Sequence, residues 1–208
     1  LMSFEMQKLL AAAVLTAPFI PLLFMGEEWA EKNPFLYFID HSDPDLIEAV
    51  REGRRQEFAA SHVDGHATDP KAEDTFYSAK LNWERLRQPQ HATMLAYYKH
   101  LIALRKQYSA LQTADLATVQ VYVFQTENSL MVERKCNEEK QSTLYLLNFS
   151  PNVQRLSIPE HLTIREKLID SAEERWQVPS SAVNHQIVFS EYLTVQPQSF
   201  IAYTTSYD

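Results

Sequence analysis

The chain has 208 residues, of which 45% are hydrophobic and 12% aromatic, and this composition supplies a packed core and excludes general disorder. Its formal net charge of -8 and its pI near 5.4 argue against a nucleic-acid partner, because phosphate binding requires basic patches. The single cysteine, Cys136, excludes an internal disulfide framework and a thiolate metal cluster, and it favours a free thiol in a reducing compartment.

The first predicted element is a helix over residues 4–15, with Ser3 as its N-cap. Pro18 ends it, because a proline disfavours helical backbone in the residue before it. Residues 9–25 carry no charge and imitate a signal peptide or a membrane span, but Pro18 and Pro21 interrupt them. No small-residue cleavage site follows either. We therefore expect no targeting segment, no membrane partner and a cytoplasmic location.

The next predicted element is a strand over residues 20–25, which ends at Gly26. Short apolar runs of this kind are typical of parallel strands that are buried on both faces. A helix, a short turn and a buried strand form half of a βαβ repeat, and the strand that should precede them is missing. We therefore expect the chain to be the tail of a longer protein. Its uncovered apolar surface, in residues 1–60, should cause self-association.

The segment from residue 31 to residue 90 predicts one helix and much irregular structure. The aromatic run at residues 35–39 is interpreted as a minor strand or a loop wall. Residues 42–45, Ser-Asp-Pro-Asp, signal the start of a helix that runs to about Ala60, with four apolar side chains facing inward: Leu46, Ile47, Val50 and Phe58. The histidines and aspartates of residues 62–69 match no zinc or calcium spacing, so we predict no metal site and no cofactor.

The remainder of the chain predicts a long helix followed by an antiparallel β-domain. Residues 91–108 show helical periodicity, and basic residues lie near the end of this helix. Beyond residue 113, β-branched and aromatic residues alternate with polar ones between turns, as in antiparallel sandwiches. The predicted strands are residues 119–125, 129–134, 143–148, 155–158, 166–169, 185–189, 192–195 and 199–204. We predict a domain boundary between residues 112 and 113.

Glu27 and Glu28, just after the predicted buried strand, are candidate substrate-binding carboxylates. Ligand chemistry in α/β folds gathers at the carboxyl ends of strands. Neighbouring side chains on an extended backbone point to opposite faces, so these two do not form a catalytic pair across a glycosidic bond. At most one of them lines a pocket, where it accepts hydrogen bonds from ligand hydroxyls. The other pairs with an arginine or caps a backbone turn.

Four aromatic residues are candidate platforms for the apolar faces of sugar rings: Trp29, Phe35, Tyr37 and Phe38. Packing of an aromatic loop in the core explains them equally well. His41 is a further candidate for substrate binding or for support of the site. The sequence contains no nucleophile elbow, no glycine-rich phosphate loop and no Cys-His pair with catalytic spacing. These residues describe a carbohydrate-compatible pocket wall without a complete catalytic set.

Residues 22–29, Leu-Leu-Phe-Met-Gly-Glu-Glu-Trp, resemble the eighth barrel strand of the α-amylase superfamily, glycoside hydrolase family 13. Within that superfamily, residues 34–41 are similar to the malto-oligosyltrehalose trehalohydrolases. Further similar stretches lie at residues 52–58, 76–83, 97–105, 147–150 and 199–200. The resemblance implies an α/β plus all-β fold. Residues 1–112 would hold the last strand and helices of a (β/α)8 TIM barrel, and residues 113–208 an antiparallel β-sandwich.

The resemblance also implies the chemistry of the complete protein. Such a retaining hydrolase cleaves the α-1,4 bond next to the trehalose end of malto-oligosyltrehalose, its malto-oligosaccharide substrate, and releases trehalose. Its catalytic acids follow barrel strands four, five and seven, and none has a match here. Residues 184–186, Asn-His-Gln, lack the carboxylate of the family's Asn-His-Asp motif. No catalytic residue is therefore transferred, and we expect the chain alone to be inactive.

Two further hypotheses remain open at this point. The chain is alternatively the tail of a glycogen-branching or other superfamily enzyme, since such enzymes share the Leu-Phe-Met-Gly core. It is alternatively a non-catalytic carbohydrate-binding or interaction module. The stretch over residues 35–41 favours a trehalohydrolase over a branching enzyme, and glycan binding by the chain would distinguish an enzyme fragment from a binding module.

Overall fold

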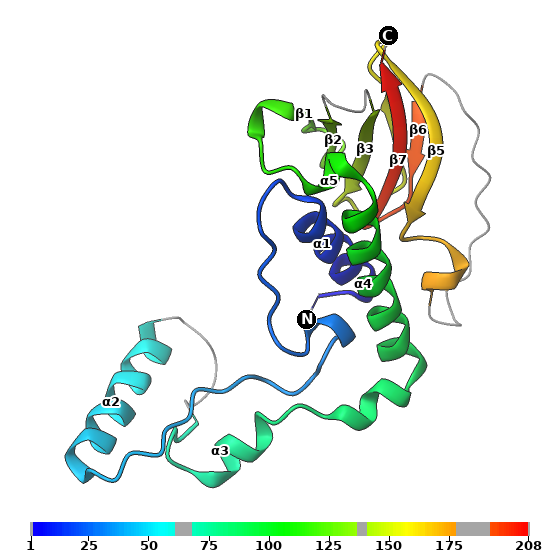
Figure 1. The fold of residues 1–208 in the computed structure, drawn as a ribbon. Coiled ribbons are helices and arrows are strands. Elements are labelled where there is room, and N and C mark those ends of the chain that lie inside the picture. The colour runs from blue at the N-terminus through cyan, green and yellow to red at the C-terminus, as the bar shows by residue number, and fades with distance from the viewer. Residues whose placement is uncertain (1, 61–67, 137–140, 178–191, 208) are drawn as a thin grey trace. The chain divides into compact units, whose positions relative to one another are not determined.

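The structure is a computed structural model that describes residues 2–60, 68–136, 141–177 and 192–207. The chain forms two compact units, Leu1–Ala30 with Leu86–Asp208, and Glu31–Arg85, and each is described by itself. The α-helices are α1 (Phe4–Thr16), α2 (Pro44–Ala60), α3 (Glu73–Ser78), α4 (Pro89–Gln107) and α5 (Ser109–Gln112) (Figure 1). Short 3-10 helices lie at η1 (Glu27–Trp29), η2 (Trp83–Arg87), η3 (Leu116–Thr118) and η4 (Glu174–Trp176).

The larger unit contains two antiparallel sheets. Their strands are β1 (Val119–Phe124), β2 (Ser129–Cys136), β3 (Gln141–Asn148), β4 (Gln154–Ser157), β5 (Leu162–Asp170), β6 (Tyr192–Val195) and β7 (Ser199–Tyr207). One sheet has five strands in the order β1-β2-β3-β7-β5, and the other pairs β4 with β6. The predicted antiparallel strands are confirmed, although β5 and β7 are longer than predicted. The strand predicted at residues 185–189 lies outside the described residues.

Alternation along the central strands explains why both faces of the large sheet are buried. In β3, Leu144 and Leu146 point into one core cluster, whereas Tyr145 and Leu147 point into the other. The first cluster also takes in side chains of β4 and β6, among them Leu193, so the small sheet covers that face. Such a two-residue period sends successive side chains to opposite faces. Each buried leucine stabilises the fold by about 2 kcal/mol.

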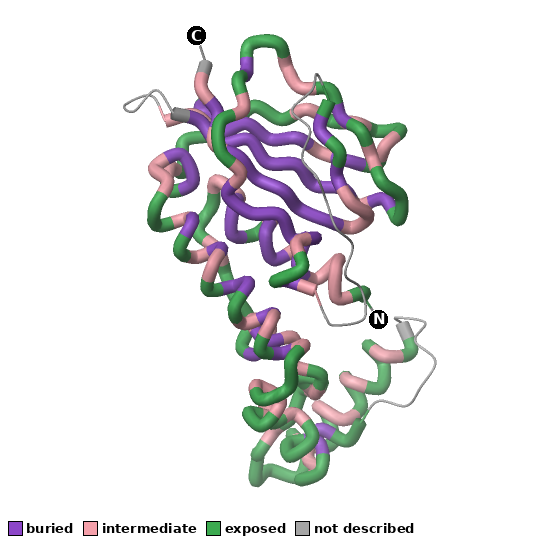
Figure 2. Tube along the Cα trace, turned by 90° about the vertical axis from the view of Figure 1, so that its right-hand side faces the viewer, coloured by how far each residue is buried: buried purple, intermediate pink, exposed green. Residues whose placement is uncertain are grey.

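Helices cover the other face of the large sheet. The predicted N-cap of α1 is confirmed, since the Ser3 hydroxyl accepts a hydrogen bond from the Met6 amide at 3.1 Å. α1 lies beside α4 and packs against β3 and β7 (Figure 1). Leu9 of α1 and Leu101 of α4 share a core cluster with Phe200 of β7. Figure 2 shows that buried residues are concentrated in these strands and in the helices that pack on them.

Two arginines and a tyrosine hold the carboxyl end of α1. The Arg134 guanidinium, fully buried on β2, donates to the carbonyl of Thr16 at 2.6 Å and also to that of Thr113. Tyr145 donates its hydroxyl to the same Thr16 carbonyl at 3.1 Å. Arg105 of α4 donates to three further carbonyls, those of Leu15, Ala17 and Phe19, at 2.6 to 2.9 Å. The carbonyls that a helix end leaves unpaired are therefore satisfied by cationic donors.

The prediction of a buried strand at residues 20–25 is wrong for this structure. These residues are not assigned to any helix or strand, and Ile20 and Leu22 are 93% and 91% exposed. A strand is stable only when neighbouring strands pair with its backbone and cover its side chains. Among the described residues, no strand pairs with this segment. The segment is therefore apolar in composition, but no element of the described chain buries it.

The smaller unit also departs from expectation. Helix α2 begins and ends where predicted, but the side chains expected to face inward are exposed or half-buried, Leu46 among them. Residues 35–39, interpreted above as a minor strand or a loop wall, form a loop. A helix buries its apolar stripe only where another element lies against it. Within the described part of this unit the stripe is covered only in part, because residues 44–59 of α2 include no buried side chain.

The two units do not coincide with the predicted division between residues 112 and 113. The helices α1 and α4 share a core with the large sheet, so they belong to the same unit as the β-domain. A boundary at residue 112 between a TIM barrel and a β-domain stays a prediction for the complete protein. Cys136 is free and half-buried. No helix in the described ranges is both long enough and apolar enough to cross a membrane.

Candidate functional site

The loop around η1 carries three of the predicted site residues, and its backbone is shaped by Gly26. This glycine has φ of 92°, in the left-handed region that a residue without Cβ adopts most readily. The Glu27 amide donates to the Phe24 carbonyl at 3.1 Å, and the Trp29 amide donates to the Gly26 carbonyl at 3.3 Å. The apolar segment therefore ends in a tight turn, and this turn places Glu27, Glu28 and Trp29 on one short helical element.

Both carboxylates of this loop bind its own backbone. Glu28 Oε2 accepts from the Gly26 amide at 2.9 Å, and Glu27 Oε2 accepts from the Phe24 amide at 3.0 Å. Each side chain is half-buried. Capping of a backbone turn was one of the two alternatives for the residue that does not line a pocket, and the structure shows it for both residues. Their adjacent positions on one turn do not provide two carboxyl groups on opposite sides of a scissile bond.

Two residues of α4, neither predicted as a site residue, hold this loop. The Tyr98 hydroxyl donates to Glu27 Oε1 at 3.3 Å, and His91 Nδ1 donates to the Trp29 carbonyl at 2.6 Å. Burial and the nearby Glu27 carboxylate raise the pKa of Tyr98, so the hydroxyl keeps its proton at neutral pH. The sequence assigned both residues only to a helix. Their position opposite η1 depends on how α4 packs, which periodicity does not reveal.

The Trp29 ring is not an open platform in this unit, because the residue is only 3% exposed. Core packing, the alternative interpretation of this aromatic residue, describes it here. The other three predicted site residues, Phe35, Tyr37 and His41, are exposed and belong to the unit Glu31–Arg85. The Arg54 guanidinium lies 5.1 Å from the centroid of the Tyr37 ring. Each unit therefore contains three of the six predicted residues.

Glu31, which is not among the predicted site residues, organises the loop that carries these three residues. Its carboxylate is 6% exposed and accepts from Arg85 Nη1 at 2.6 Å and from the Asn82 amide at 2.7 Å. It also accepts from the amides of Lys32 and Asn33. One buried carboxylate thus joins the two ends of the smaller unit. A sequence offers no local pattern for a contact between residues that lie about fifty positions apart.

Replacing Tyr98 with phenylalanine should lower the free energy of unfolding by about 1 kcal/mol, because it removes one hydrogen bond to a carboxylate and leaves the ring in place. Amide hydrogen exchange at residues 26–30 should accelerate, because this bond ties η1 to α4. The matched control is Tyr108→Phe, whose hydroxyl makes only a 3.5 Å contact with Gln107. Equal exchange at residues 26–30 in Tyr98→Phe and wild type would contradict the role of Tyr98.

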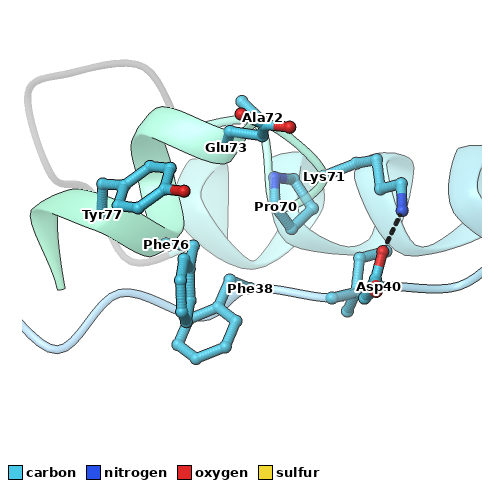
Figure 3. Close-up of a pocket in the computed structure, with 9 residues that line it drawn as sticks. Phe38, Asp40, Pro70, Lys71, Ala72, Glu73, Phe76 and Tyr77 are labelled. Atoms are coloured by element: carbon cyan, nitrogen blue, oxygen red, sulfur yellow. Dashed lines mark hydrogen bonds and ion pairs between the residues drawn. The ribbon is translucent and has the colours of Figure 1, made fainter. Parts of the chain in front are cut away.

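The smaller unit contains a pocket of about 390 Å³ (Figure 3). Phe38, Phe76 and Tyr77 lie at one end, and the ion pair between Lys71 and Asp40, with its two atoms 2.6 Å apart, lies at the other. The ring centroids of Phe38 and Phe76 are 5.0 Å apart and meet edge to face. The pocket thus combines apolar rings with charged groups, although Phe38 is the only candidate platform residue that lines it.

No cluster of three or more His, Cys, Asp or Glu side chains suited to a metal occurs in the described part of the chain. His62, Asp64 and His66 of the predicted loop, and the Asn-His-Gln at residues 184–186, lie outside the described residues.

Comparison with known proteins identifies relatives of one name. Seven curated proteins named malto-oligosyltrehalose trehalohydrolase share 40–46% identity with the chain. The protein of Saccharolobus solfataricus is 46% identical over 104 residues, which are 50% of this chain and 17% of that protein. That of Arthrobacter ramosus is 44% identical over 98 residues, or 47% of this chain and 17% of that protein. The chain thus spans about a sixth of the length of these relatives. No family model matches it.

Solved structures of the α-amylase family share its fold. A Salmonella typhimurium structure assigned as an α-amylase is 28% identical with a TM-score of 0.72, over 97% of this chain and 31% of that one. The isomaltulose synthase of Erwinia rhapontici has a TM-score of 0.61 at 16% identity, over 97% of this chain and 38% of that one, and shows the fold alone. The resemblance read from residues 22–29 and 34–41 is therefore confirmed, and the chain is related in sequence, over about half of its length, to the malto-oligosyltrehalose trehalohydrolases.

Proposed function

We propose that this chain is the C-terminal part of a glycoside hydrolase that cleaves the α-1,4-glucosidic bond next to the trehalose end of malto-oligosyltrehalose and releases trehalose. The observation that carries the proposal is the 40–46% identity to seven proteins of that name over about half of the chain. Residues 1–112 would belong to the catalytic TIM barrel, and residues 113–208 would form its C-terminal β-domain.

The η1 loop would serve as part of the pocket wall in the complete enzyme. Its carboxylates are fixed by Phe24, Gly26 and Tyr98, so the loop is a rigid element that displays polar groups. Rigid positioning of groups that meet a substrate lowers the entropic cost of binding it. The exposed aromatic loop with Phe35, Tyr37 and His41 would supply further contacts to the malto-oligosaccharide.

We expect hydrolysis of the glycosidic bond only from the complete enzyme. A retaining glycosidase needs a nucleophilic carboxylate and an acid about 5 Å apart on either side of the bond. Glu27 and Glu28 lie next to each other and bind their own backbone, so they do not fill these roles. The isolated chain should therefore release no trehalose from malto-oligosyltrehalose above the uncatalysed rate. No cofactor is required by this reaction.

A chimera tests the proposal. The 104 matched residues of the Saccharolobus solfataricus protein would be replaced by the corresponding residues of this chain. We expect the chimera to release trehalose from malto-oligosyltrehalose, as the parent does, and to form no new branch points in amylose. Its matched control is the parent truncated before the exchanged region, which should be inactive. A chimera that folds like the parent but releases no trehalose would contradict the proposal, and branching activity would favour a branching enzyme.

A further inference from the structure

We propose that the pocket of the unit Glu31–Arg85 binds one neutral, polyhydroxylated ring, such as a glucosyl unit of a malto-oligosaccharide. The proposal deepens the proposed function and rests on it for the identity of the sugar. The volume of about 390 Å³ lies at the lower end of the range of ligand pockets, which suits a single ring better than a long chain.

The aromatic end of the pocket provides the apolar contact. Phe38, Phe76 and Tyr77 line it, and the Phe76 and Tyr77 centroids are 5.4 Å apart in an edge-to-face arrangement. Tyr77 is 57% exposed, so part of its ring surface stays open to a ligand although Lys80 lies 4.5 Å from its centroid. A sugar ring has an apolar face of C–H groups, and aromatic rings bury such surface without the loss of a hydrogen bond.

The opposite end of the pocket provides the polar contacts. The hydrogen bond from Lys71 holds the pKa of Asp40 below its usual range, so this carboxyl is ionised at neutral pH. An ionised carboxylate has about four lone-pair sites and an ammonium has three N–H donors, so each keeps hydrogen-bonding capacity beyond their mutual contact. Sugar hydroxyls both donate and accept, and they suit such a mixed pair.

The arrangement of charges favours a neutral ligand. An anion would meet the carboxylates of Asp40 and Glu73, which both line the pocket. A cation would meet Lys71, and Lys80 already lies 4.8 Å and 4.5 Å from the centroids of Phe76 and Tyr77, where a ligand cation would otherwise bind. An uncharged ligand meets like charge at none of these side chains.

The walls of the pocket are held in place before any ligand binds. The Ile39 amide donates to the Pro70 carbonyl at 2.9 Å, which ties the two wall segments together. Asp69 receives a bidentate contact from Arg51, at 2.9 and 2.8 Å, and its carbonyl accepts from Thr75 Oγ1 at 2.7 Å. The base of α3 is thus anchored to α2 within this unit, and pre-formed walls reduce the ordering cost of binding.

The test is a titration of the isotope-labelled 208-residue chain with maltose, followed by NMR. We expect saturable shifts of the amides at residues 71–77, with a dissociation constant on the order of 1 mM for so small a contact. Tyr77→Ala should weaken binding about fivefold or more, and Tyr77→Phe should retain it, because the ring and not the hydroxyl makes the contact. Asp40→Asn, at a fully exposed side chain, should also weaken binding without a risk to folding.

Three comparisons make the result specific. Tyr192→Ala removes a partly exposed tyrosine of β6 and should leave maltose binding unchanged. Tetramethylammonium and maltobionate, a cation and the anionic counterpart of maltose, should bind more weakly than maltose. Absence of saturable shifts, tighter binding of either ion, or maltose binding that is unaffected by both Tyr77→Ala and Asp40→Asn would overturn the proposal. The titration measures binding and involves no bond cleavage. An inactive chimera would therefore contradict the proposed function, whereas an absence of maltose binding would contradict only the proposal for the pocket.

Discussion

Replacing Arg134 with methionine should lower the free energy of unfolding by about 3 kcal/mol, because a buried charged hydrogen-bond donor contributes about 1.5 to 3 kcal/mol and its loss removes the Arg134 donor from the Thr113 carbonyl. The guanidinium joins the end of α1, through the Thr16 carbonyl, to the segment that enters the β-domain, through the Thr113 carbonyl. Burial lowers the pKa of Arg134, but an arginine remains charged at neutral pH. Methionine retains the apolar stem and removes only the donors.

Urea unfolding of the variant, followed by circular dichroism, measures this change. The matched control is Arg155→Met on β4, where the guanidinium lies over the ring of Tyr192 at 5.3 Å and makes a surface contact. That variant should change the free energy of unfolding by less than about 0.5 kcal/mol. Equal stabilities of the two variants would show that the carbonyls at the end of α1 find other partners, and the structural role assigned to Arg134 would be wrong.

Replacing Ile20 and Leu22 together with lysine should convert an associating chain into a monomer of 24.1 kDa. We expect the wild-type chain to self-associate through its first sixty residues, because the segment from Phe19 to Met25 exposes six large apolar side chains, among them Phe24. Contiguous apolar surface of this kind marks interaction sites, and an extended backbone without a strand partner in the described chain favours pairing with another strand.

Sedimentation velocity at several micromolar concentrations measures the change. Leu116→Lys with Val153→Lys is the matched control, since these residues are exposed apolar side chains outside the segment. The control should associate as the wild type does, whereas the Ile20→Lys, Leu22→Lys variant should not. Thermal stability should be almost the same in all three chains, because none of the four positions is buried. A wild-type chain that sediments as a monomer at every concentration contradicts the expectation.

Local pattern was sufficient for most of the secondary structure. Ser3 caps α1 as predicted, because an N-cap acts on an amide three residues away. The strands of the β-domain were recognised because apolar residues alternate with a period of two, and this alternation is a property of the sequence alone. The relation to the malto-oligosyltrehalose trehalohydrolases could also be read directly, since it depends on stretches of contiguous residues.

The state of residues 20–25 was decided by what surrounds them. Their composition favours a buried strand, but burial depends on neighbouring strands, and the described chain provides none at this segment. The contacts of the candidate site residues likewise depended on their surroundings. Glu27 and Glu28 were found from their place after the apolar run, whereas their hydrogen bonds to the loop backbone and to Tyr98 depended on the fold of that loop and the packing of α4.

The sequence by itself thus determined most of the helices and strands, and to which enzymes the chain is related. Only the tertiary structure decided the burial of Lys8 and Arg134, two cations that a pattern assigns to the surface. It also decided that α1 and α4 form one core with the sheet, across the predicted boundary. The physical reason is the range of the interactions. Caps and periodicity act over a few residues, whereas a buried charge depends on carbonyls that lie far away in the chain, such as those of Ser171 and Trp176 for Lys8.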